Sequence, residues 1–353
     1  SQKSGKAHGG PRRLRAAIGC GHCDPQQIKP VTIPDSTQRR RVRLVKAPQA
    51  NFGQSTMRGF TSPGASDPDM VHVIILAIVQ GLAELLPISS SAHVIVAEKL
   101  MGMNPAAPEM TLLLVMLHTG TMFAVIVYFW QRWRLAFFSS VPQLKSFVAG
   151  LIVATVLTGV VGGAIIELIE KVLMRHEAHA WVEQLFGRLD LIAGALAVAG
   201  VLILVAGVIE NRRRKAVPPQ KLTPAQYSSI GAMQGLCIPF RGFSRSGATI
   251  STGLLMRVAR SSAEDFSFAL AVVLTPPADA REIWRLYQSQ HHHLAGMAPA
   301  ALPSALGMIC AFLAGLLALK WLSRWLESGR WHFFGIYCLF AAGAVAYLNH
   351  TGF

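Results

Sequence analysis

Charged residues are scarce in this chain. Asp, Glu, Lys and Arg make up 14% of its 353 residues, whereas they make up roughly 25% of an ordinary soluble domain. Hydrophobic residues account for 52%, and the mean hydropathy is +0.41. These values exclude a disordered chain and a typical soluble enzyme. They favour a set of membrane spans, each of which needs about 20 mostly apolar residues.

Cysteines are few as well, five in all. Cys237, Cys310 and Cys338 lie in apolar segments, where a cysteine is usually a small buried hydrophobe. Cys20 and Cys23 form a single CxxC without a second pair, which is weak support for a zinc or redox site. The net charge is +15, but aromatic residues do not alternate with the basic ones as they do in proteins that stack nucleic-acid bases. We therefore expect no nucleic-acid partner.

Residues 1–69 differ in character from the rest. They are polar, basic and rich in Gly, Pro and Gln, without a sustained helical or strand period, so we expect a disordered basic tail. They contain no apolar core followed by a small-residue cleavage site, which argues against a secretory signal peptide. Met70 directly precedes the first apolar run. One hypothesis places the start of translation there, with residues 1–69 as upstream sequence.

From residue 71 onward, apolar segments follow one another closely. Two of them are interrupted by short polar stretches and are expected to form re-entrant helical hairpins, and six others are expected to be transmembrane helices. The interrupted segments run through Val71–Met101 and Tyr227–Val258. The expected spans are Thr111–Trp130, Phe147–Ile169, Leu191–Ile209, Phe266–Ala280, Leu302–Trp321 and Phe333–Leu348.

The two interrupted segments resemble each other. Gln80-Gly81 matches Gln234-Gly235 at an offset of 154 residues, and Ser90 meets a serine at the same offset. Each segment is followed by three spans, and because three is odd, the two repeats would have opposite orientations. We therefore expect an all-α polytopic membrane protein built as an inverted repeat, about 71–210 and 225–349, with its broken helices meeting near the midplane.

Loop charges indicate the orientation. If the first hairpin enters from outside, 13 Lys and Arg residues fall in inside loops and six fall outside, as the positive-inside tendency requires. The inside set is Arg132, Arg134, Lys145, Arg212, Arg213, Arg214, Lys215, Lys221, Arg257, Arg260, Lys320, Arg324 and Arg330. The outside set is Lys99, Lys171, Arg175, Arg188, Arg281 and Arg285.

The interruptions are the expected functional site, because irregular backbone at membrane depth survives only where it is buried in protein or lines a wet cavity. In the first interruption, Gln80 and Glu84 share one helix face. A carboxylate in an apolar segment is a functional candidate by default, although Glu84 could also only lock the fold by pairing with a buried arginine. Hydroxyls and a histidine follow Pro87 at the start of the next helix, namely Ser89, Ser90, Ser91 and His93.

The second interruption has the features of an anion site. Its glycines let the backbone approach an anion, its hydroxyls add donors, and Arg245 supplies a planar fork that matches phosphate oxygens. The helix that follows points its positive N-terminus at the same place. Besides Arg245, the candidate substrate-binding residues are Arg241, Gly242, Ser244, Ser246, Gly247 and Thr249, with Gln234 as the counterpart of Gln80. Together the interruptions suit a lipid phosphate or diphosphate, although a glycine-serine hinge whose arginine pairs with Glu84 would look the same.

These motifs resemble those of the bacterial undecaprenyl-diphosphate phosphatase family, also called bacitracin-resistance proteins. The likeness runs from Val71 to the C-terminus. It implies that residues 70–353 form one integral membrane phosphatase domain of the bacterial inner membrane, with its active site open to the periplasm. It also implies hydrolysis of undecaprenyl diphosphate to undecaprenyl phosphate and phosphate, which recycles the lipid carrier for peptidoglycan and gives bacitracin tolerance. The bilayer and the polyprenyl diphosphate are thus the expected partners, and the sequence leaves a homodimer open.

The resemblance implies a divalent cation, Mg²⁺ or Ca²⁺, with Glu84 as the candidate ligand. We expect Arg245 to bind the diphosphate and Ser90 to attack the terminal phosphorus with His93 as general base. Two alternatives stay open: His93 attacks, or Glu84 activates water. The chain departs from the usual family pattern at two positions. Gln80 stands where the family often has Glu, and a glutamine cannot act as a base. Arg241 replaces a Pro. A transporter or flippase of a polyprenyl phosphate would use the same anion site.

Overall fold

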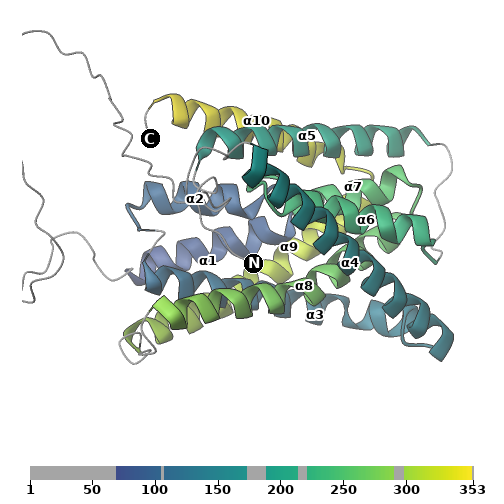
Figure 1. Ribbon diagram of the computed structural model, residues 1–353, viewed down its shortest axis with the longest axis horizontal. Coiled ribbons are helices and arrows are strands. Elements are labelled where there is room, and N and C mark those ends of the chain that lie inside the picture. The colour runs from purple at the N-terminus through teal and green to yellow at the C-terminus, as the bar shows by residue number, and fades with distance from the viewer. Residues whose placement is uncertain (1–68, 105–106, 173–187, 214–220, 290–297, 352–353) are drawn as a thin grey trace, which may run out of the picture. The chain divides into compact units, whose positions relative to one another are not determined.

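The computed structural model describes residues 69–104, 107–172, 188–213, 221–289 and 298–351. The described residues form helices and short connections, without a strand among them (Figure 1). Residues 1–68, for which a disordered tail is predicted, lie outside the described ranges. The described helices, as ten elements, are α1 Met70–Leu85, α2 Ser90–Leu100, α3 Pro108–Ala136, α4 Val141–Val172, α5 Leu189–Arg212, α6 Pro224–Cys237, α7 Arg245–Leu255, α8 Arg260–Ser289, α9 Ala298–Glu327 and α10 His332–His350.

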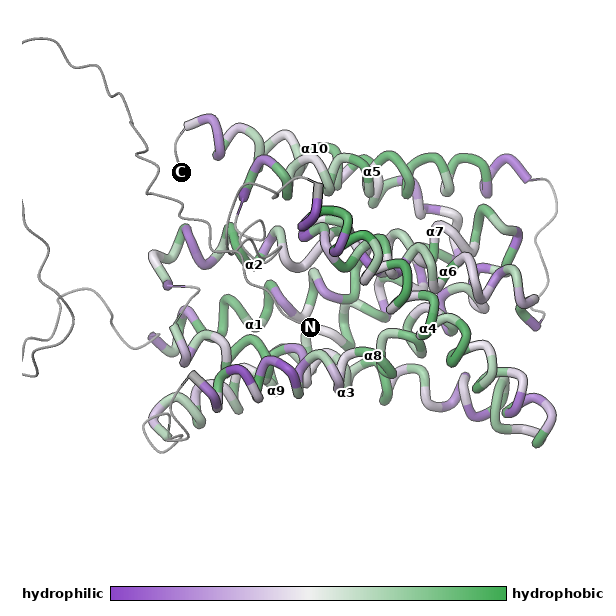
Figure 2. Tube along the Cα trace, in the orientation of Figure 1, coloured by the Kyte–Doolittle hydropathy of each residue, from purple (hydrophilic) through white to green (hydrophobic). Residues whose placement is uncertain are grey.

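Five of these helices are long and apolar enough to cross a membrane: α3, α4, α5, α9 and α10. Their outward side chains are apolar too. On α4, Val148, Ile152, Val156 and Val160 follow at four-residue spacing and are between 42% and 61% exposed, as a lipid-facing stripe would be. Figure 2 shows the same pattern on α5, which is hydrophobic along most of its length. The protein is therefore a polytopic membrane protein.

The sixth expected span, α8, is 30 residues long but is less apolar than the other five. Pro276 and Pro277 lie inside it, and the part that follows carries Asp279, Arg281 and Glu282. This polar part lies directly after Thr275, which lines the pocket described below. The helix therefore combines the length of a span with polar residues beside the site.

The expected repeat extends through four pairs of helices. Shifted by 154 residues, the starts of α1 to α4 fall at 224, 244, 262 and 295, and α6 to α9 begin at 224, 245, 260 and 298. The packing repeats as well, because α4 packs against α6 in the same way that α9 packs against α1. Helices α5 and α10, the last of each half, lie side by side (Figure 1).

The shared Gln-Gly motif has a packing reason. A Cβ atom on Gly81 of α1 would lie 2.7 Å from the carbonyl oxygen of Ala311 in α9, and one on Gly235 of α6 would lie 2.7 Å from that of Thr158 in α4. Both distances are well below van der Waals contact. Glycine therefore lets each short helix lie directly against the backbone of a long helix from the other half.

Each interruption follows from local chemistry. Pro87 disfavours helical backbone at the residue before it, and Leu86 is extended, with φ −74° and ψ 150°, so α1 ends at Leu85. Helix α7 begins at Arg245 because the Ser244 side chain accepts a hydrogen bond from the Gly247 N–H and caps the helix. The four short helices have 16, 11, 14 and 11 residues, and at about 1.5 Å per residue none of them reaches the roughly 30 Å of a bilayer core.

Candidate functional site

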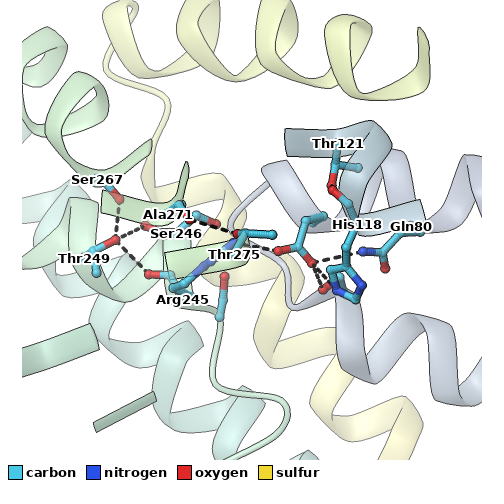
Figure 3. A network of polar contacts seen from close by, with 12 residues as sticks. Gln80, His118, Thr121, Arg245, Ser246, Thr249, Ser267, Ala271 and Thr275 are labelled. Carbon is cyan, nitrogen blue, oxygen red and sulfur yellow. Dashed lines mark hydrogen bonds and ion pairs between the residues drawn. The ribbon is translucent and has the colours of Figure 1, made fainter. Parts of the chain in front are cut away.

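The two interruptions meet at an ion pair. Glu84, in the last turn of α1, and Arg245, the first residue of α7, lie 2.6 Å apart between Oε1 and Nη2, although 161 residues separate them in the sequence. The Glu84 side chain is 14% exposed and that of Arg245 is 31% exposed. The site expected from sequence in two separate segments is thus one place in space (Figure 3).

The second oxygen of Glu84 has partners from its own half. The Ser90 hydroxyl donates to Oε2 at 2.5 Å, and the Gln80 amide donates to the same oxygen at 3.2 Å. Gln80 and Glu84 thus share one helix face, as their spacing predicts. Because an ionised carboxylate only accepts hydrogen bonds, Glu84 is placed to take the proton of Ser90.

Hydrogen bonds between serine side chains and backbone groups join the two interruptions. The Gly242 N–H donates to the Ser91 hydroxyl at 3.1 Å, and the Ser246 hydroxyl donates to the Leu86 carbonyl at 3.3 Å. Gly242 has φ +100°, and a Cβ there would also lie 2.5 Å from the carbonyl oxygen of Ile192. The position therefore requires glycine for both conformation and space.

Several groups predicted to donate hydrogen bonds to phosphate already have partners in the protein. The Gly247 N–H donates to Ser244, which caps α7. The Thr249 hydroxyl donates to the Arg245 carbonyl at 2.8 Å and lies 2.5 Å from the Ser267 hydroxyl of α8. In this state these groups shape the start of α7, and the guanidinium of Arg245 is the main donor directed at the pocket.

His93 lies against α10. Its Nδ1 is 2.7 Å from the Ser89 carbonyl oxygen and its Nε2 is 2.7 Å from the Tyr337 hydroxyl. Tyr337 was not among the residues predicted from sequence. Its hydroxyl is a polar group in the middle of an apolar helix, which is the signal that could have drawn attention to it.

The two remaining predicted residues lie away from the ion pair. Arg241 is exposed and interacts electrostatically with Glu98 of α2. Gln234 is buried in α6, and its Oε1 has no hydrogen-bond partner among the described residues. At the repeat offset Ile238 stands where the first half has Glu84, so the second hairpin has no counterpart of this carboxylate.

Residues of α3 and α8 complete the pocket. Its lining includes Glu84, His118, Thr121, Arg245 and Thr275 (Figure 3), and its volume is about 20 Å³, which is room for roughly one water molecule. A phosphate group is larger than this space, so lining side chains must move to admit one. The sequence prediction missed the residues from α3 and α8, although a histidine and a threonine one turn apart within an apolar span are a recognisable polar interruption.

His118 has a fixed orientation in this pocket. Its Nδ1–H donates to the Leu114 carbonyl at 2.8 Å, which directs Nε2 at Glu84, 3.7 Å from Oε2. Within the described ranges no set of three or more His, Cys, Asp or Glu side chains could hold a metal ion by itself. The protein thus presents the Glu84 carboxylate, the Arg245 guanidinium, the His118 imidazole and several hydroxyls around a small pocket.

Comparison with known proteins agrees with this arrangement. The model of the family described as "Bacitracin resistance protein BacA" matches residues 73–345, which include both interruptions. The protein named undecaprenyl-diphosphatase 2 of Acinetobacter baylyi is 53% identical over 282 residues, covering 78% of this chain and 97% of the relative. Undecaprenyl-diphosphatase 1 of Burkholderia pseudomallei is 34% identical over 281 residues, covering 76% and 93%, and the undecaprenyl-diphosphatase of Rhodopirellula baltica is 34% identical over 284 residues, covering 80% and 98%. The chain belongs to the bacitracin resistance protein family.

Proposed function

We propose that the protein is an undecaprenyl-diphosphatase, which hydrolyses undecaprenyl diphosphate to undecaprenyl phosphate and phosphate. The observation that carries this proposal is the contact of Glu84 with both Ser90 and Arg245. It brings together a base, a hydroxyl and a guanidinium that can donate hydrogen bonds to phosphate. The names of relatives with 53% and 34% identity support the same activity. Recycling of the lipid carrier for cell-wall synthesis and tolerance to bacitracin follow from it.

Arg245 is the residue proposed to bind the diphosphate. Its guanidinium is held by one carboxylate oxygen of Glu84 at 2.6 Å, and a diphosphate offers several oxygens in the same planar geometry. Substrate therefore replaces Glu84 as the partner of Arg245. This exchange opens the pocket and releases the carboxylate for chemistry.

Ser90 is the proposed nucleophile and Glu84 its base. As the bond from Ser90 Oγ to the terminal phosphorus forms, the Ser90 proton moves to Glu84 and the bond from phosphorus to the bridging oxygen breaks. Undecaprenyl phosphate leaves with the electron pair of that bond. Water then attacks the phosphoserine, and the bond from phosphorus to Ser90 Oγ breaks. Glu84 returns its proton to that oxygen, which restores the hydroxyl, and phosphate leaves with the oxygen and protons of the water. Positioning and charge neutralisation supply most of the acceleration in such reactions.

A divalent cation fits this site only together with the substrate. Mg²⁺ in phosphoryl-transfer sites uses one or two carboxylates plus phosphate oxygens, and the donor set here offers the Glu84 carboxylate beside a diphosphate site. Glu84 is the residue that would hold Mg²⁺ or Ca²⁺. The ion would supply neutralisation of the charge that develops on the phosphate oxygens.

The proposal includes a membrane arrangement. The pairs α1–α2 and α6–α7 are re-entrant hairpins in inverted repeats, and the six long helices, α8 included, span the inner membrane. The excess of basic residues in one set of loops, 13 against six, supports a site that opens to the periplasm. A polyprenyl chain then lies in the bilayer while its diphosphate reaches Arg245, and a homodimer is compatible with this arrangement.

Phosphate release by the purified protein tests the function. With undecaprenyl diphosphate in detergent, we expect turnover in the wild type and losses of about 100-fold or more in Glu84→Gln and Arg245→Ala. Glu167→Gln is the matched control, because Glu167 is an exposed carboxylate paired with Lys171 on α4. Near-normal turnover in both site variants would reject the site.

The same assay separates hydrolysis from transport. A carrier that moves a polyprenyl phosphate would also need Arg245 and the helix N-termini, but transport requires a sealed compartment and detergent provides none. A wild-type protein that binds the lipid diphosphate in detergent without releasing phosphate would favour the transporter.

A further inference from the structure

The His93 ring is held at both of its nitrogen atoms. Because the Ser89 carbonyl only accepts, Nδ1 carries the hydrogen of that 2.7 Å bond. In the neutral ring, Nε2 then accepts from the Tyr337 hydroxyl, also at 2.7 Å, and the two rings stack with centroids 5.7 Å apart and planes 14° apart. The lone pair that a base or nucleophile needs is thus engaged by Tyr337, a residue 244 positions away on α10.

The carbonyl that His93 holds belongs to a strained residue. Ser89 has φ +68° and ψ 97°, a left-handed conformation that is uncommon for residues other than glycine. At the second interruption the left-handed residue is Gly242, which adopts this conformation at little cost. The Ser89 carbonyl accepts from the His93 backbone N–H at 3.4 Å and from the ring at 2.7 Å. The ring bond is the shorter, so the side chain of His93 is the main partner of this carbonyl.

The conformation of Ser89 directs the two serines that follow it. The Ser90 hydroxyl reaches Glu84 at 2.5 Å, and the Ser91 hydroxyl accepts from the Gly242 N–H at 3.1 Å. If the Ser89 backbone relaxed, both hydroxyls would rotate away from these partners. The contacts therefore form a series from Tyr337 through His93 and Ser89 to Ser90.

We propose that Tyr337 is a positioning residue of the phosphatase. It holds the neutral His93 ring in the orientation that fixes the Ser89 carbonyl, and thereby keeps the Ser90 hydroxyl against Glu84. His93 then acts through Ser89, without accepting the Ser90 proton. This inference rests on the proposed function, in which Ser90 attacks the terminal phosphorus.

Tyr337→Phe is the first test, because it removes the hydroxyl and keeps the stacked ring. We expect kcat to fall about fivefold, as loss of one hydrogen bond between a partly exposed tyrosine and His93 would cause. KM should stay the same because Arg245 is untouched, and the limbs of the pH profile should not move. Tyr347→Phe is the matched control, since Tyr347 lies on the same helix and is 69% exposed. An unchanged or higher kcat in Tyr337→Phe, or a displaced limb, overturns the proposal.

Substitution of His93 gives an independent test. An asparagine amide nitrogen can take the place of Nδ1 and donate to the Ser89 carbonyl, whereas a glutamine amide reaches the place of Nε2. We expect His93→Asn to keep at least about 10-fold more activity than His93→Gln and His93→Ala. Equal loss in all three variants, with normal thermal unfolding midpoints, means that His93 reacts through Nε2 and overturns the proposal.

A double variant tests whether Tyr337 acts through His93. Tyr337→Phe added to His93→Asn should cost no further activity, because no imidazole remains to be oriented. An additional loss of about fivefold, equal to that of the single variant, would show that Tyr337 acts elsewhere. A wild-type protein that releases no phosphate would contradict the proposed function, whereas an active wild type with an equally active Tyr337→Phe contradicts only the positioning role.

Discussion

The Ser90 hydroxyl donates to the Glu84 carboxylate across 2.5 Å, although the two residues lie on different helices with the turn at Pro87 between them. The other carboxylate oxygen is held by Arg245 from the opposite half of the chain. One carboxylate therefore links the nucleophile proposed for this site to the residue proposed to bind its substrate. Substrate binding is therefore coupled to activation of Ser90. A diphosphate that binds Arg245 displaces Glu84 from it, and Glu84 then has Ser90 as its remaining close partner from the turn.

Ser90→Ala is predicted to reduce phosphate release by about 100-fold or more, since it removes the attacking oxygen. Ser328→Ala is the matched control, because Ser328 is exposed and its hydroxyl donates to the Trp325 carbonyl after α9. Substrate labelled in the terminal phosphate should leave label on the Ser90 peptide after an acid quench. Label on His93, or full activity in Ser90→Ala, would assign the attack to another group.

Gly81→Ala and Gly235→Ala are predicted to lower the free energy of unfolding by about 1–3 kcal/mol each. In both variants the new methyl group would lie 2.7 Å from a carbonyl oxygen of the neighbouring long helix. Thermal unfolding in detergent measures the effect. Gly163→Ala on α4 is the control, because apart from its chain neighbours and its own helix backbone no described atom lies within 4 Å of its Cβ position, and alanine there should stabilise the helix by up to about 1 kcal/mol.

A buried ion pair near the start of α8 is predicted to matter for stability alone. Arg132 of α3 lies 3.0 Å from Glu264 and 3.0 Å from Asp265, and the Glu264 side chain is 1% exposed. Arg132→Met leaves this carboxylate buried without its cation, which costs about 3–5 kcal/mol. Arg188→Met, which breaks an exposed pair with Asp190, should cost at most about 1 kcal/mol.

Activity measurements on these variants distinguish a role of Arg132 in stability from a role in catalysis. Protein that remains folded below its unfolding midpoint should release phosphate at nearly the wild-type rate, because Arg132 does not line the pocket. Adding Glu264→Leu to Arg132→Met should restore part of the midpoint, since the unpaired charge is then gone. A midpoint that stays at the wild-type value in Arg132→Met would contradict the structural role.

Local sequence patterns predicted the parts of the fold that depend on neighbouring residues. The start of α2 within one residue of Ser91 and the shared face of Gln80 and Glu84 follow from a proline and from helix spacing. The pairing of Glu84 with Arg245 was also accessible, because a charge at membrane depth needs an opposite charge nearby. Each of these inferences needs only the residues within a few helical turns, or the rule that a charge buried in the membrane requires a partner of opposite charge.

The residues that sequence analysis missed depend on how distant helices pack. His118 faces Glu84 because α3 packs between α1 and α8, and Tyr337 faces His93 because α10 reaches α2. His93 was expected beside the Ser90 hydroxyl from its separation of three residues, and the structure places its ring on Tyr337 instead. A spacing of three residues fixes the helix face, but the rotamer follows from partners that the local sequence does not contain.

His118 is predicted to contribute to turnover through Glu84. When the diphosphate takes Arg245, the carboxylate loses its closest charged partner, and the imidazole of His118, with Nε2 3.7 Å from Oε2, is the next nearest basic side chain that the structure records. His118→Asn keeps a donor toward the Leu114 carbonyl but removes Nε2. We expect kcat to fall about 10-fold, as for loss of one group that supports a catalytic carboxylate. His350→Asn, at the exposed end of α10, is the matched control, and equal rates for both variants would show that His118 only lines the pocket.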